Sequence, residues 1–164
     1  MVKEKQPEIV RKREMQSQIN AGREVRALNW KQPYLHLMQN GIDKVETRTW
    51  KTDFRGLVLM CASQSPYQYN IVRSISGQRQ TGRIMQLLPA EGTPRGQALF
   101  IGELIDCVPM HPKDENACFV AFNPDLWCHV YGDVFPIDPF PWKGRQKWKV
   151  LDDSIKSMIK IQGI

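Results

Sequence analysis

Residues 44 to 50, KVETRTW, space a cation, an anion, a second cation and an indole two positions apart. Successive side chains of a β-strand point to opposite faces, so a strand here places four groups on one face: Lys44, Glu46, Arg48 and Trp50. Such a row suits the floor of a polar pocket, and it equally suits a solvated strand edge. If the protein is an enzyme, Lys44 is the residue expected to handle a proton, because a desolvated lysine can act as a base.

A second row lies near the end of the chain, in WKGRQKWKV. Its basic residues occupy alternate positions: Lys143, Arg145, Lys147 and Lys149. As a strand, this segment presents a basic ladder on one face while Trp148 and Val150 pack inward. Basic rows beside aromatic rings suit a nucleic-acid backbone with stacked bases. The alternative is a solvated face whose lysines protect a strand edge, with Trp148 in the core.

The cysteines favour neither disulfides nor a metal. None of the four belongs to a CxxC pair, and Cys61 and Cys107 sit in apolar runs where a free cysteine behaves as a small buried hydrophobe. One set with zinc-ligand chemistry has irregular spacing: His111, Cys118, Cys128 and His129. We therefore expect no metal and no cofactor.

Composition bounds the class of protein. A length of 164 residues, with 41% hydrophobic and 24% charged residues, predicts one globular domain with a real core. The net charge of +6 favours polyanionic partners. The longest apolar run is too short to span a bilayer, and no apolar segment follows the N-terminal lysines. These features predict a cytoplasmic protein that binds no membrane.

The elements that must position both rows follow from periodicity and turn residues. The pattern of residues 1–22 predicts a charged helical extension with a thin apolar stripe. The domain is expected to comprise residues 23–164. Strands are expected at 25–30, 44–50, 56–63, 97–108 and 128–137, with a short helix from Pro33 to about 40 and a closing strand after 141. The polar stretch from Ser63 to Arg95 predicts only a weak helix and a loop. Many short strands with few helices indicate an α+β domain built on a small barrel.

The first of these segments resembles a known family. LNWKQPYLHLMQNGIDKVETRTWKTDFRG is similar to the signature of the ASCH (activating signal cointegrator homology) family, a branch of the PUA-like superfold. The matching positions are Gln32-Pro33-Tyr34, Gly41, Val45-Glu46, Arg48, Thr49-Trp50 and Arg55-Gly56. GELIDC and KGRQKWKVLD resemble later strands of the family, so that the resemblance covers roughly residues 24–153.

The resemblance implies a PUA-like β-barrel of five or six strands with flanking helices, and a cleft between the barrel and the first helix. It places a ligand-binding set around this cleft: Lys31, Gln32, Lys44, Glu46, Arg48 and Trp50. His36, in the helix, is expected to be exposed or hydrogen-bonded rather than functional. Two roles stay open for Glu46 and Arg48, which either contact a ligand or simply pair with each other.

Function is also inferred from the resemblance. RNA is the usual partner of the superfold, and duplex DNA contact is attributed to the cointegrator branch, so we expect a non-catalytic, regulatory module that binds RNA, DNA or a nucleotide-like ligand. Some small bacterial members resemble this domain but hydrolyse acetylated cytidine with a K-T-x-T-x-R strand. Counting back from Arg48, the catalytic positions hold Asp43 and Glu46, so the lysine and threonine are replaced in register. A hydrolase acting on a modified nucleoside, or a ribonuclease, is the alternative.

Overall fold

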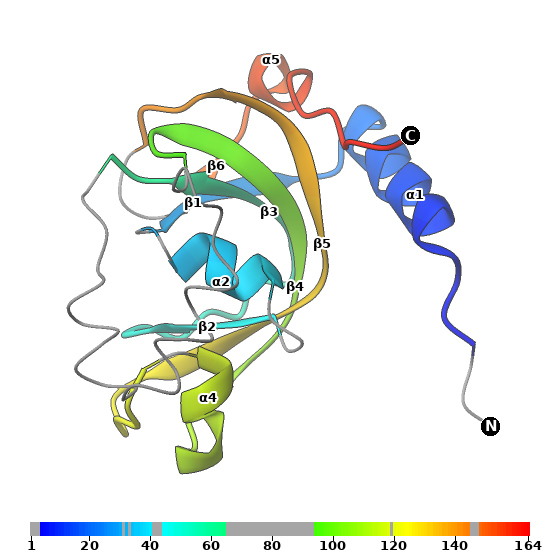
Figure 1. Cartoon of the computed structure of the whole chain (residues 1–164). Helices are drawn as coiled ribbons and strands as arrows, with labels where there is room; N and C mark the ends of the chain where they lie inside the picture. The colour runs from blue at the N-terminus through cyan, green and yellow to red at the C-terminus, as the bar shows by residue number, and fades with distance from the viewer. Residues whose placement is uncertain are drawn as a thin grey trace.

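A computed structural model describes residues 4–30, 32, 34–40, 44–64, 94–118, 120–144 and 148–164 (Figure 1). Its elements, in chain order, are α1 (Glu8–Asn20), β1 (Val25–Trp30), α2 (Tyr34–Asn40), β2 (Val45–Arg48), β3 (Gly56–Ala62), β4 (Gln97–Pro109), the 3-10 helix η1 (Pro112–Asp114), α4 (Glu115–Cys118), β5 (Trp127–Pro141), β6 (Lys149–Val150) and α5 (Asp153–Lys156). Within this part of the chain, no helix has the length and apolar character needed to cross a bilayer.

The strands form one mixed six-stranded sheet in the order β2-β5-β4-β3-β1-β6. The β1 and β3 strands run parallel, and the other neighbours run antiparallel. The predicted α+β class is therefore confirmed. The prediction of a closed barrel is wrong, because β2 and β6 are the two edges of an open sheet. Closure requires the edge strands to pair along their length, and these have only four and two residues.

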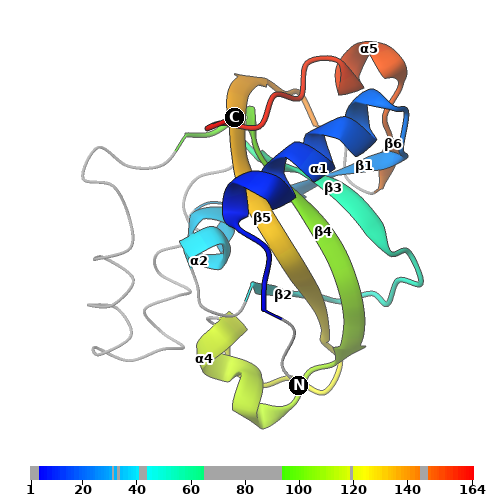
Figure 2. The same ribbon diagram turned by 90° about the vertical axis from the view of Figure 1, so that its right-hand side faces the viewer.

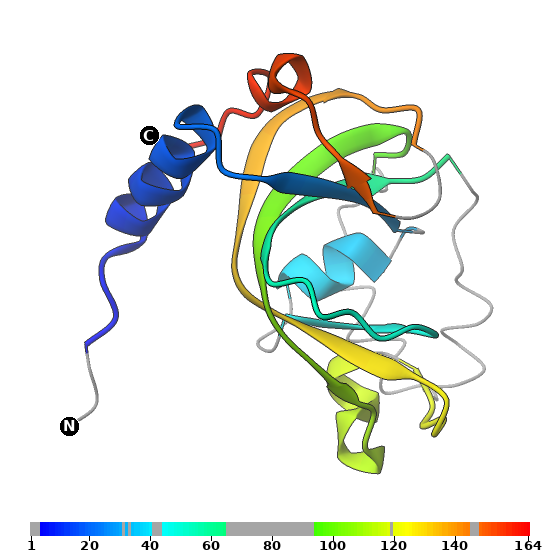
Figure 3. The same ribbon diagram turned by 180° about the vertical axis from the view of Figure 1, so that it is seen from behind.

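The sheet curves strongly, and both of its faces are covered near the centre. Figures 1 and 3 show α2 on the concave side and α1 on the convex side. Every residue of β3 is buried, because alternate side chains feed two separate clusters. Leu57 and Leu59 join the cluster that includes α1, whereas Val58 and Met60 join the cluster that includes α2. A strand buried on both faces explains the continuous apolar run in the sequence.

Helix α1 packs on the convex face through a narrow stripe, Met15 and Ile19. Gln16 adds polar contacts, since its side chain donates to the Ile159 carbonyl at 2.9 Å and accepts from the Ile161 N–H at 2.8 Å. The chain then turns into β1 at Gly22, whose φ of +95° is a conformation that favours glycine. Figure 2 shows α1 crossing this face beside the C-terminal segment.

Most of the predicted strands begin and end within a few residues of the observed ones, and α2 lies where the Pro33 signal predicted it. The closing strand differs, since residues 142–144 and Trp148 are not in a strand, and among the described residues of this segment only Lys149 and Val150 pair with β1. Val150 was predicted to pack inward, but it is 54% exposed. A two-residue edge strand has little to pack against on its outer side, which accounts for this exposure. The weak helix predicted between Ser63 and Arg95 lies outside the described residues over 65–93.

Candidate functional site

Glu46 and Arg48 lie on the same face of β2, as alternation predicts, and they bind each other. The Arg48 Nε donates to Glu46 Oε1 at 3.0 Å. The same guanidinium donates through Nη2 to the carbonyl of Asn29, on β1, at 2.7 Å. Arg48 therefore bridges the edge strand β2 and a strand on the far side of the sheet, across its concave face.

The Glu46 carboxyl is buried, with the residue only 7% exposed, and its charge is consequently sensitive to pH. Burial raises the pKa of Glu46 to about 7, although the charge and hydrogen bond of Arg48 act in the opposite direction. The Trp30 indole lies close enough to lower this pKa slightly, without reaching hydrogen-bond geometry. Near neutral pH the carboxyl is thus divided between its two protonation states.

Aromatic rings enclose this pair. The Arg48 guanidinium lies 5.1 Å from the centre of the Trp30 ring, and the Tyr131 ring lies 6.1 Å from that of Trp30. Burial, followed by the nearby Glu46, holds the pKa of Tyr131 well above its ordinary value. Neither the Tyr131 hydroxyl nor the Trp30 indole N–H has a hydrogen-bond partner in the part of the chain that the structure describes. Buried polar groups without partners are uncommon in native proteins.

A row of aromatic rings continues from this pair toward the closing segment. Trp50 contacts His129 at 4.6 Å and Trp148 at 5.3 Å between ring centres, both edge to face. Trp148 then contacts Phe54 at 5.4 Å, and the Arg26 guanidinium lies 4.2 Å from the Phe54 ring. We call Trp50, Trp148 and Phe54 the aromatic row; all three are partly exposed. The row packs against the concave-face cluster of the core, keeps part of its surface exposed and has the Arg26 guanidinium at its Phe54 end.

His129 holds one end of the row in place. Its Nε2 lies 3.0 Å from the Trp50 carbonyl, which only accepts, so Nε2 carries the proton. Burial lowers the pKa of His129, which favours the neutral ring, with Nδ1 as an acceptor. This Nδ1 is buried and has no partner among the described residues. Sequence reasoning considered His129 only for zinc, although a histidine within the otherwise apolar CHVYG run was a usable signal.

The segment that follows β5 comes close to Asn29, on β1, at Gly144. A side-chain carbon on Gly144 would lie 2.1 Å from the Asn29 amide nitrogen, so any other residue at this position requires the Asn29 side chain to move. Because the Asn29 carbonyl binds Arg48, the two rows picked out in the sequence meet at Asn29. Lys143 and Lys149 are exposed, whereas Arg145 and Lys147 lie outside the described residues. The predicted four-residue ladder is therefore described at two positions.

The Gln32 side chain is buried and forms hydrogen bonds within the protein. It is fully buried, its Nε2 donates to the Pro94 carbonyl at 3.0 Å, and the same nitrogen lies 2.9 Å from His36 Nδ1. Burial lowers the pKa of His36, which suits an accepting Nδ1. His36 is thus half-buried and hydrogen-bonded. Lys31, predicted beside Gln32, lies outside the described residues.

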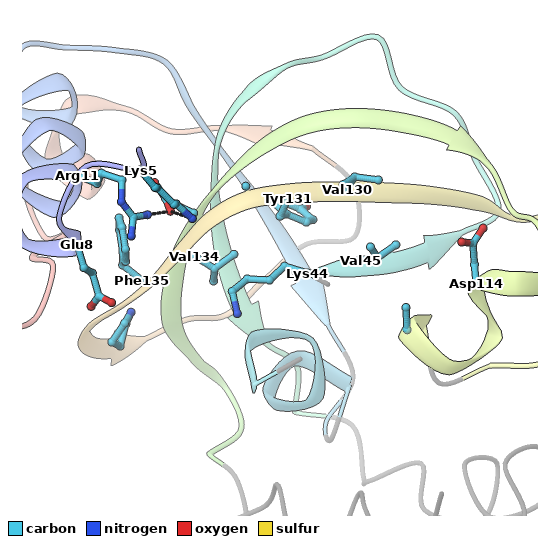
Figure 4. Close-up of a pocket in the computed structure, with 14 residues that line it drawn as sticks. Lys5, Glu8, Arg11, Lys44, Val45, Asp114, Val130, Tyr131, Val134 and Phe135 are labelled. Carbon is cyan, nitrogen blue, oxygen red and sulfur yellow. Dashed lines mark hydrogen bonds and ion pairs between the residues drawn. The ribbon is translucent and has the colours of Figure 1, made fainter. Parts of the chain in front are cut away.

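Lys44 belongs to a different surface. It lines a groove of about 610 Å³ with Lys5, Arg11 and Asp114, whereas Glu46, Arg48 and Trp50 are not among the residues that line it. Figure 4 shows Lys5 and Arg11 at one end, Asp114 at the other and Lys44 between them. Both Lys5 and Arg11 pair with Asp133. Burial, then the charge of Lys5, lowers the pKa of Lys44.

Of the four residues considered as zinc ligands in the sequence, only the two cysteines lie close together. The Cys118 and Cys128 sulfurs lie 3.8 Å apart. His129 points its ring toward Trp50, and His111 Nδ1 accepts from the Lys113 N–H. Over the described ranges, no three or more His, Cys, Asp or Glu residues form a group that could hold a metal.

Comparison of the chain with models of known protein families finds no match, and comparison with curated proteins finds none either. The ASCH resemblance accordingly stays a prediction that depends on the motif residues between Gln32 and Gly56.

Proposed function

We propose that the chain is a non-catalytic module of the ASCH type, with a PUA-like fold, that binds nucleic acid through one nucleotide-like unit held at the aromatic row and Arg48. The observation that carries the proposal is the aromatic row itself: three partly exposed rings contact one another beside the concave-face cluster of the core, and the Arg26 guanidinium lies 4.2 Å from the Phe54 ring. Bases stack on such rings regardless of sequence, and each stacked base contributes about 1–3 kcal/mol.

Charge supports the same proposal. Lys143 and Lys149 lie on either side of Trp148 in the sequence and are exposed, so they are available to phosphates. The whole chain carries +6. The guanidinium of Arg48 is partly exposed (23% of the side chain), so it retains some capacity to meet a ligand while it binds Glu46. A planar guanidinium makes paired hydrogen bonds to a base edge or a phosphate that a lysine does not reproduce.

The placement of Lys44, Glu46 and Thr47 supports the non-catalytic part of the proposal. Lys44 lines the groove that contains Lys5 and Arg11, and Glu46 is bound to Arg48. To activate the Thr47 hydroxyl, Lys44 would have to lie on the same strand face as Thr47. The two are three positions apart, so alternation places them on opposite faces.

Fluorescence anisotropy with labelled single-stranded RNA, single-stranded DNA of the same sequence and duplex DNA tests the proposal. We expect weak binding that falls with salt, with a slope of roughly −0.7 to −0.9 in log K per phosphate contacted. The double variant Lys143→Glu, Lys149→Glu should lower affinity for every strand by roughly tenfold at low salt. Its matched control is Arg13→Glu with Lys160→Glu, which makes the same charge change at two other exposed positions.

Replacing Arg48 with lysine should instead change which strand is preferred, because the charge stays and the planar fork is lost. If the Lys143/Lys149 variant and its control bind equally well, the lysines are a solvated surface. If no strand binds the wild-type protein at low salt, the proposed function is wrong.

A hydrolase acting on a modified nucleoside is the second candidate, and the lowered pKa of Lys44 at a groove is the observation that favours it. Incubation with acetylated nucleosides and with labelled RNA, followed by chromatography, decides between the two. Product that disappears in Lys44→Met supports the hydrolase, whereas binding without turnover supports the module.

A further inference from the structure

Two buried thiols face each other where the end of α4 meets the start of β5. Cys118 is the last residue of α4 and Cys128 is the second residue of β5, and their sulfurs lie 3.8 Å apart. The residues are 5% and 2% exposed, and both are free cysteines. They belong to a small apolar cluster with Met110, separate from the two main clusters of the core.

The two thiols also form a directional chain with a carboxylate. The Cys128 sulfur lies 3.8 Å from Asp114 Oδ2, and a carboxylate oxygen can only accept, so Cys128 donates to Asp114. The Cys118 thiol is then the donor toward the Cys128 sulfur. Asp114 is itself fixed, because its Oδ2 accepts from the His111 backbone N–H at 2.8 Å. A proton acceptor therefore lies next to one of two neighbouring sulfurs.

From this arrangement we infer that Cys118 and Cys128 are a site of reversible oxidation, which forms a disulfide when a hydroperoxide reaches it. A disulfide requires an S–S separation of about 2.05 Å, so the sulfurs must approach by somewhat less than 2 Å. The movement is local, because α4 has only four residues and Cys118 is at its end.

The chemistry balances with one hydroperoxide. The Cys128 thiol first loses its proton to Asp114. The Cys128 sulfur then attacks the outer peroxide oxygen and the O–O bond breaks. The alkoxide that leaves takes up the proton from Asp114. The Cys128 sulfenic acid is then attacked by the Cys118 sulfur; the S–S bond forms, the S–O bond breaks, and hydroxide leaves with the Cys118 proton as water. The protein loses two electrons, and the hydroperoxide is reduced to an alcohol and water.

Burial makes the pair slow to react and selective. It raises the pKa of the Cys118 thiol, and it raises that of Cys128, so the reactive thiolate is scarce at neutral pH and the oxidation rate should rise with pH. The other cysteines lie elsewhere. Cys107 is opposite His129 in the β4–β5 register, one residue from Cys128, which puts its side chain on the other face. Cys61 lies in β3, in the cluster that contains α1.

The test is to treat the native full chain with hydrogen peroxide over a range of pH, count free thiols, and map peptides without reduction. We expect two of the four thiols to disappear together, with one linked peptide pair, Cys118 to Cys128, lighter by two hydrogen atoms. Dithiothreitol should restore all four thiols. Cys107→Ser is the control and should leave the link unchanged, whereas Cys118→Ser should abolish it.

Equilibration with glutathione redox buffers gives a second measurement that does not depend on reaction rate. Because the fold holds the two sulfurs together, the equilibrium constant for the link should be higher in native than in denatured protein by roughly tenfold or more. Equal constants, or a product that contains mainly sulfonic acids or links to Cys61 or Cys107, would overturn the inference. Four intact thiols in both experiments would overturn it as well.

Discussion

Lys44 and Glu46 are two residues apart in the chain, yet they lie in regions that differ in burial, charge balance and neighbours. Glu46 is buried among Trp30, Tyr131 and the arginine that binds it. Lys44 lines an open groove in which Lys5, Arg11 and Asp133 form ion pairs. Glu46 is buried and depends on the cation that binds it, whereas the ion pairs of the groove involve partly exposed side chains that solvent screens. Loss of one member should therefore matter far more in the first region than in the second.

The largest effect is expected for Arg48→Met. The substitution leaves a buried carboxyl without its cation and frees the Asn29 carbonyl, so we expect the free energy of unfolding to fall by about 3 kcal/mol at pH 8. The loss should be smaller at pH 5, because Glu46 can then be protonated. Urea denaturation at both pH values provides the measurement. Equal losses at the two pH values would mean that Glu46 is not the group that Arg48 stabilises.

The pH dependence of stability is the next effect in size. The folded pKa of Glu46 is about 7, above the ordinary value of 4.5, so the folded state binds this proton more tightly than the unfolded state does. Its contribution is present at low pH and is lost as pH rises from about 4.5 to 7, with a total of roughly 3 kcal/mol. The difference between wild type and Glu46→Gln isolates it, because the lowered pKa values of His36 and His129 affect both proteins equally. A difference that stays constant across this range would contradict the assignment.

Gly144→Ala tests whether the close approach to Asn29 matters. The new methyl would overlap the Asn29 amide, so we expect a loss of about 1–2 kcal/mol in the free energy of unfolding. Gly132→Ala, in the groove, is the matched control, since its nearest side-chain neighbour would be a flexible Ile105 methyl at 3.3 Å. Thermal unfolding of both variants gives the comparison. If Gly132→Ala is the more destabilised of the two, the closing segment does not depend on this contact.

The smallest effect is expected for Lys44→Met. The folded pKa of Lys44 is lowered, so its charged form is slightly disfavoured in the folded state, and its removal should change stability by no more than about 0.5 kcal/mol. The same denaturation experiment applies. A loss as large as that of Arg48→Met would show that the groove is as tightly coupled as the concave face.

Particular residues show which features a single sequence can predict. Glu46 and Arg48 were expected on one face because strand alternation is local, and β3 was expected because a run buried on both faces is continuously apolar. The partners that give Glu46 its environment come from β1 and β5, and no local pattern states that Glu46 lies opposite His129. The prediction of a closed barrel was wrong for the same reason, since closure depends on how far two edge strands that are distant in the sequence extend.

Lys44 shows a second limit. Alternation predicted that Lys44 shares a strand face with Glu46, but Lys44 lies just before β2 and lines a groove with Lys5 and Arg11, from a segment predicted to be an extension outside the domain. The packing of α1 through Met15 and Ile19 depends on tertiary contacts with residues near the other end of the chain. A thin apolar stripe of this kind predicts a helix, but it does not identify the surface that the helix covers.

The two hydrogen bonds of Gln16 have a consequence for the order in which the protein folds. Helix α1 is the first described element that a ribosome would release, yet the groups that Gln16 binds, on Ile159 and Ile161, are released about 140 residues later. A helix of 13 residues is marginal in water on its own, and contacts between such distant residues form late. We therefore expect α1 to be nascent and sensitive to proteases until residues 159–161 have been synthesised, and to become protected only when they complete its binding surface.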